Sequence, residues 1–218
     1  MAAPGLLPIV FRKSPPYNVT YDWFDSLLNL GYQRFYACCA TESGGSANFK
    51  YFLTTRSSLD ASTGDFYESA SQNNANYTLT FELNFDVEFS VPVVVAGADA
   101  FINATTYGSS TDMDYYIVYT VYHYDGVTET SLGTKTTQSY SVAASYARDC
   151  TEIALTEKAF KAGDILRLEV KVYTKMDPAG AETIKLYYDP ASNLTVTDTD
   201  SRTVGTDFTL DVPFKIDI

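Results

Sequence analysis

The sequence predicts an all-β protein, an antiparallel β-sandwich of the jelly-roll type. Three observations carry this prediction: a long alternating segment at residues 77–91, a succession of hairpin-like segments after it, and room for at most one short helix. About eight to ten strands separated by turn residues are typical of sandwiches and jelly rolls.

The clearest strand is "YTLTFELNFDVEFSV", residues 77–91, where apolar and polar side chains alternate without interruption. Because side chains alternate across a strand with period two, the odd-numbered residues share one face. We expect that face to enter the core, and the even face, with Glu82, Asp86 and Glu88, to meet solvent or a partner. The segment exceeds the usual length of about five or six residues, so a bend or bulge is expected part-way.

Further strands are expected at 32–40, 48–55, 164–174 and 208–218, and a hairpin at 115–133. In that hairpin Asp125-Gly126 favours a type I′ turn between two β-rich runs. The Ser, Asn, Asp and Gly content of 56–76 predicts a long surface loop. Residues 22–29 fit a helical turn or a strand equally well.

The chain has 218 residues and no evident linker, which predicts a single domain over 21–218. Residues 1–20 form either an extended N-terminal arm or a first edge strand. Prolines at positions 4, 8, 15 and 16 disfavour a helix and a central strand there.

The formal net charge is −12, without a cluster of Lys and Arg, which disfavours a nucleic-acid partner. No segment is long and apolar enough for a membrane span, and the N-terminus does not have the pattern of a signal peptide. We therefore expect synthesis in a cytoplasm. Cys38, Cys39 and Cys150 are odd in number and lack metal-ligand spacing, so all three are expected to be reduced.

No catalytic, cofactor-binding or metal-binding residue is predicted, and the chain is expected not to be an enzyme. The single histidine, His123, lies within a strand and has no nucleophile motif near it. The acidic segments 111–114 and 197–207 lack the spacing of a calcium loop. The sequence does not exclude a catalytic pair of carboxylates of the glycosidase type, because such acids need not be neighbours in the chain.

Tyrosine is the compositional oddity, with eighteen residues in the chain. The strand at 115–124 is aromatic or branched on both faces, which is typical of a central strand or of one covered by another subunit. Tyrosine is common at protein interfaces because its ring is apolar and its hydroxyl stays hydrogen-bonded. A sugar-stacking platform is the alternative use. The predicted interface residues are Tyr115, Tyr116, Tyr119, Tyr122 and Tyr124.

The phrases "VYHYDGVTETSLG", "FKAGDILRLEVKVYT", "KLYYDP" and "DVPFKIDI" give residues 77–218 a resemblance to β-sandwich virion proteins of tailed bacteriophages and related viruses. The resemblance implies a decoration protein on the outer capsid surface, without a cofactor, made in the host cytoplasm and carried on the virion. Its expected partners are further copies of itself, a trimer first, and the major capsid protein or other virion proteins. The acidic charge fits a position away from packaged DNA. The alternatives are a carbohydrate- or host-receptor-binding module and a polysaccharide-cleaving jelly-roll enzyme.

Overall fold

The computed structural model is an all-β protein, as predicted. It describes residues 19–20, 30–41, 49–56, 66–109, 113–142, 146–176, 182–188, 195–197 and 203–215. The strands of this part are β1 (Val19–Thr20), β2 (Leu30–Thr41), β3 (Phe49–Thr54), β4 (Phe66–Glu68), β5 (Thr78–Glu88), β6 (Val93–Val95), β7 (Asp99–Gly108), β8 (Met113–Tyr124), β9 (Glu129–Thr136), β10 (Tyr140–Val142), β11 (Tyr146–Ala154), β12 (Lys158–Phe160), β13 (Ile165–Met176), β14 (Ile184–Tyr187), β15 (Thr195–Thr197), β16 (Thr203–Gly205) and β17 (Thr209–Lys215).

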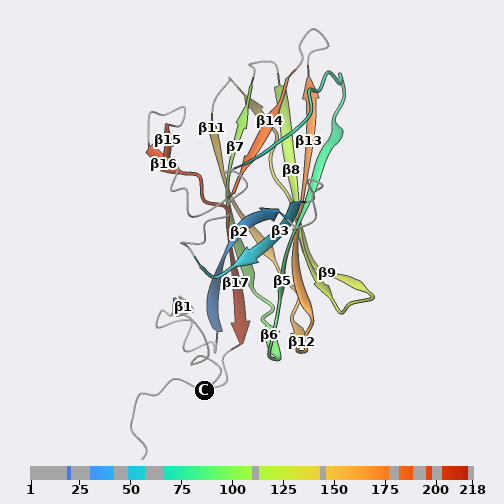
Figure 1. The fold of residues 1–218 in the computed structure, drawn as a ribbon, viewed down its shortest axis with the longest axis vertical. Helices are drawn as coiled ribbons and strands as arrows, with labels where there is room; N and C mark the ends of the chain where they lie inside the picture. Colours follow the sequence, from blue (N-terminus) through green and yellow to red (C-terminus); the bar gives the residue numbers. More distant parts are fainter. Residues whose placement is uncertain are drawn as a thin grey trace, which may run out of the picture.

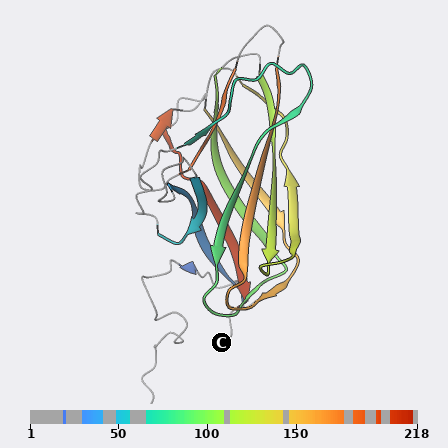
Figure 2. The same cartoon turned by 45° about the vertical axis from the view of Figure 1, so that its right-hand side comes forward.

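The strands form two layers that run along the long axis of the molecule (Figure 1). One layer has the order β9-β8-β13-β5, and the other contains β2, β17, β7, β11 and β14. Strand β3 joins them, since it pairs with β2 along its length and touches β5 in one parallel bridge at Phe52 and Asp86. Figure 2, turned by 45°, shows the layers facing each other. The architecture is therefore sandwich-like, although all described strands except β15 and β16, which pair only with each other, are hydrogen-bonded into one continuous mixed sheet.

The core lies between the layers and is rich in aromatic rings. Phe85 of β5 and Tyr119 of β8 both pack against Phe208, with ring centroids 5.4 and 6.3 Å apart. All three side chains are almost completely buried. At about 1.5–3 kcal/mol for each large apolar side chain, this burial is a main source of stability. The aliphatic residues around these rings include Ile102, Ile117, Ile153, Leu166, Leu168 and Ile184.

The predicted alternation of 77–91 is correct in its central part and wrong at both ends. Phe81, Leu83 and Phe85 are buried as expected, whereas Tyr77 and Leu79 are 39% and 47% exposed. The cause is a β-bulge, because Val172 is paired with Phe81 while Tyr173 is already paired with Leu79. The extra residue in β5 reverses the side chains before it. After the strand ends, Val91 is again exposed, at 39%.

The hairpin between β8 and β9 is confirmed, but its loop differs from the prediction. The last pair joins Tyr124 to Glu129, so four residues rather than two form the connection. The Asp125 carboxylate accepts hydrogen bonds from the backbone N–H groups of Val127 and Thr128, at 3.0 and 2.7 Å. This side-chain cap and a backbone hydrogen bond from the N–H of Asp125 to the carbonyl of Thr128, at 3.3 Å, stabilise the loop.

The predicted loop at 56–76 and the predicted thiols are partly or wholly within the described residues. The expected loop at 56–76 contains β4, which pairs with β14, so that part of the loop prediction is wrong. The predictions for 1–18, 22–29, 111–112 and 198–202 lie outside the described residues. Cys38 and Cys39 are buried thiols and Cys150 is an exposed one. No helix in the described ranges is long and apolar enough to cross a bilayer.

Candidate functional site

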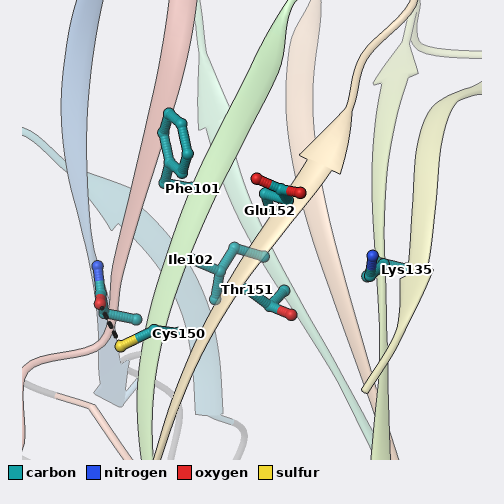
Figure 3. A pocket seen from close by; sticks show the side chains of 7 residues that line it. Phe101, Ile102, Lys135, Cys150, Thr151 and Glu152 are labelled. Carbon is teal, nitrogen blue, oxygen red and sulfur yellow. Dashed lines mark hydrogen bonds between the residues drawn. The ribbon is translucent and has the colours of Figure 1, made fainter. Parts of the chain in front are cut away.

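An open surface cleft has a volume of about 340 Å³. It lies across β7, β11 and β9, and its volume is at the lower end of the range of about 300–1,000 Å³ typical of small-molecule sites. Figure 3 shows Lys135 of β9 across the cleft from Thr151 and Glu152 of β11. The lining residues are Phe101, Ile102, Asn103, Lys135, Cys150, Thr151 and Glu152.

The cleft exists because β11 and β9 approach closely at one point. β11 pairs with β7 along its whole length, and the N–H of Thr156, just after β11, donates to the carbonyl of Leu132 in β9 at 2.8 Å. Next to this bond, a Cβ on Gly133 would lie only 2.4 Å from the carbonyl oxygen of Ala154. Only glycine permits this approach of two backbones. Lys135 lies two residues further along β9 and is thereby placed beside the outer strands of the other layer.

The cleft combines a cation, a carboxylate, a thiol and an aromatic ring. Glu152 is paired in register with Phe101, and Cys150 with Asn103. The Cys150 thiol donates a hydrogen bond to the Asn103 side-chain oxygen at 3.0 Å. Phe101 is 41% exposed, so its ring is accessible to a ligand. Such a lining suits a small ligand with both charged and apolar parts.

A buried carboxyl lies directly behind the cleft. Asp149, between Arg148 and Cys150 on β11, faces the interior, where the Tyr140 hydroxyl donates to its Oδ1 at 2.8 Å. Burial raises the pKa of Asp149, and the hydrogen bond from Tyr140 offsets part of that effect. This hydrogen bond links β11 to β10.

His123 forms a second buried polar pair, remote in the chain from the cleft residues. Its Nε2 lies 2.7 Å from Oδ2 of Asp164, and the same oxygen accepts the backbone N–H of Lys161 at 2.8 Å. The hydrogen bond from His123 lowers the pKa of Asp164. The imidazole also packs edge-on against Phe160 at 4.6 Å. In the described part of the chain, Nδ1 of His123 has no hydrogen-bond partner.

The predicted interface tyrosines fall on opposite faces of β8, as the alternation required. Tyr115 and Tyr119 lie in the core, 1% and 0% exposed, where the Tyr115 hydroxyl hydrogen-bonds to Thr106. Burial raises the pKa of Tyr115 to about 12. Tyr116, Tyr122 and Tyr124 lie on the outer face of the layer. The structure therefore does not bring the five residues together into one surface.

The cleft was not predicted from the sequence. Its residues come from three strands, and only the pairing of β7 with β11 brings Phe101 next to Glu152. A weak signal was present, since Phe101 occupies a position on the polar face of its strand. Among the described residues, no group of three His, Cys, Asp or Glu side chains could hold a metal ion.

No protein-family model and no curated protein matches the sequence. Among solved structures, an α-amino acid ester hydrolase labelled with selenomethionine matches 83% of this chain and 36% of its own, with TM-score 0.54 and 12% identity. An aminopeptidase from a marine sediment archaeon, Thaumarchaeota archaeon, matches 83% of this chain and 37% of its own, at TM-score 0.48 and 11% identity. A structure of infectious bursal disease virus, Gx strain, matches 70% of this chain and 35% of its own, with TM-score 0.25 and 12% identity.

The first of these likenesses shows a shared fold, and this chain spans about a third of the length of that hydrolase. The likenesses to the aminopeptidase and the virus are too weak to support an argument. The prediction of a capsid decoration protein that is not an enzyme is contradicted, because the fold is shared with an α-amino acid ester hydrolase. The resemblance to bacteriophage virion proteins is not confirmed beyond weak viral matches. The expected self-association and site of synthesis stay predictions.

Proposed function

We propose that this chain works in a hydrolytic enzyme, as a β-sandwich domain like that of the α-amino acid ester hydrolase. The observation that carries the proposal is the fold likeness, which extends over 83% of this chain at TM-score 0.54. The sandwich corresponds to 36% of that hydrolase, so an enzyme of this kind contains the domain as one part of a larger whole.

The cleft supports the proposal, because its chemistry fits an ester of an α-amino acid. Such a substrate carries an ammonium group, an acyl group and a side chain. The Glu152 carboxylate provides an ion-pair partner for the ammonium group, and the exposed ring of Phe101 provides an apolar contact for the side chain. The net charge of −12 also favours the approach of a cationic substrate.

To test the proposal, a tagged form of the chain is expressed in the cells that make it. It is recovered under mild conditions with the proteins bound to it, and the hydrolysis of α-amino acid esters is measured. We expect hydrolysis well above that of an untagged control. Complete recovery of the chain with no activity above the control would overturn the proposal.

A further inference from the structure

The outer face of the β5-β13-β8 layer carries an aromatic platform, which we define as Tyr77, Leu79, Tyr116 and Tyr173. Leu79, Tyr173 and Tyr116 are direct cross-strand neighbours on three adjacent strands. The rings of Tyr116 and Tyr173 stack at 4.9 Å with planes 10° apart, and Tyr77 lies 5.0 Å from Tyr116. The platform owes its existence to the bulge in β5, which turns Tyr77 and Leu79 outward.

The platform is held in shape by hydrogen bonds beside it. The Tyr77 hydroxyl is bonded to the Ser139 hydroxyl at 2.5 Å, and the hydroxyls of Thr80 and Thr174 are bonded at 2.7 Å next to the bulge. The Tyr77 ring is therefore restricted before a ligand covers it. Pre-organisation of this kind favours binding.

The charges around the platform are mainly negative. Two cations lie near the platform, and each already has an acidic partner: Lys171 pairs with Glu82 and Glu169, and Lys175 with Asp114. Three carboxylates thus accompany two cations, so the surroundings favour a basic ligand over an acidic one.

One segment of the chain has the complementary chemistry. Residues 1–16, "MAAPGLLPIVFRKSPP", contain four prolines, Arg12 and Lys13, and no acidic residue, in a chain whose net charge is −12. Proline-rich segments favour the polyproline II conformation, which is recognised by exposed aromatic side chains. We propose that residues 1–16 dock on the aromatic platform of a second copy of the chain.

The position of β1, in the layer opposite to the platform, is the reason for proposing a second copy. β1 pairs with β2, in the layer opposite to the one that carries the platform, so the preceding residues start from the far side of the sandwich. Eighteen residues span at most about 60 Å when extended, and a domain of this size has a radius of gyration of about 17 Å. The segment is therefore long enough to reach a neighbouring molecule. This inference does not depend on the proposed hydrolytic function.

A binding experiment tests the platform and the segment together. A fluorescent peptide of residues 1–16 is titrated into the chain that lacks these residues, and anisotropy is measured. We expect saturable binding that weakens at least tenfold in the double variant Tyr116→Ala/Tyr173→Ala and in Leu79→Ser. Tyr124→Ala, on the same face of β8 but at its far end, is the matched control and should bind like the parent. Circular dichroism verifies that each variant is folded.

The same peptide with Arg12 and Lys13 both replaced by Glu should bind at least tenfold more weakly. Absence of saturable binding at millimolar peptide, or equal affinity for the parent and for both platform variants, would overturn the proposal. Light scattering of the full chain then identifies the source of the segment. Assemblies that become monomers when residues 1–16 are removed support a second copy, whereas a full chain that is monomeric at all concentrations contradicts it.

Discussion

Gly133 of β9 lies so close to Ala154 of β11 that a Cβ on residue 133 would be 2.4 Å from the Ala154 carbonyl oxygen. The contact joins the edge strands of the two layers, and the cleft lies beside it. Both the fold and the cleft therefore require a residue without a side chain at position 133.

Gly133→Ala should destabilise the protein by about 1–3 kcal/mol, because the new methyl group meets a backbone atom that has no room to move. Gly97→Ala is the matched control, since a Cβ there would have its nearest contact at 3.4 Å and should be close to neutral. Denaturant unfolding measures both. Equal stabilities for the two variants would contradict the close approach of β9 and β11.

The bulge in β5 predicts a sharp difference between two leucines of the same strand. Leu83→Ala should cost about 2–5 kcal/mol, because Leu83 is 4% exposed in the core. Leu79→Ala should cost less than about 0.5 kcal/mol, because Leu79 lies on the outer face. The uninterrupted alternation of the sequence predicts similar losses at both positions, so chemical denaturation distinguishes the two arrangements.

Asp149 should make stability fall as the pH rises above the usual range of a carboxyl group. Burial raises the pKa of Asp149, so the folded state binds its proton more tightly than the unfolded state does. Asp149→Asn removes this titration while its side-chain oxygen can still accept from Tyr140. The variant should therefore gain stability relative to the parent as the pH is raised from about 3.5 to 7. A constant difference between their thermal midpoints over that range would contradict the raised pKa.

Asp164 should have the opposite pH dependence. The hydrogen bond from His123 lowers its pKa, so its contribution to stability is present above the usual carboxyl pKa and is lost as the pH falls through the folded-state value. Asp164→Ala should be less stable than the parent at neutral pH, and the two should converge in acid. Thermal unfolding at pH 7 and at about pH 2 measures this, and an equal difference at both values would refute it.

The sequence was sufficient for the fold class, because period-two alternation is a local property of a strand. Phe81, Leu83 and Phe85 are in the core for the reason that the alternation gave. The alternation did not locate the bulge, because the bulge depends on how β5 pairs with β13, some ninety residues later in the chain. Nor did it predict the cleft, because Phe101, Lys135 and Glu152 meet through pairing between distant strands.

The predicted function depended on composition and on short phrases, and these do not distinguish one use of a β-sandwich from another. Tyr115 and Tyr119 illustrate this, since both are buried in the core of the single chain although their residue type is also common at interfaces. The fold itself occurs in a hydrolase, which composition did not reveal.

We propose that the cleft binds the substrate of a hydrolytic enzyme. Steady-state hydrolysis of an α-amino acid ester by material recovered on the tagged chain tests this, comparing the parent with Glu152→Gln and with Glu88→Gln as the exposed control on β5. We expect activity in all three proteins, with KM raised about tenfold in Glu152→Gln alone and kcat little changed, since an ion pair to the substrate ammonium group is worth about 1.4 kcal/mol at that ratio. An equal KM for the three proteins, or no hydrolysis by any of them, would contradict it.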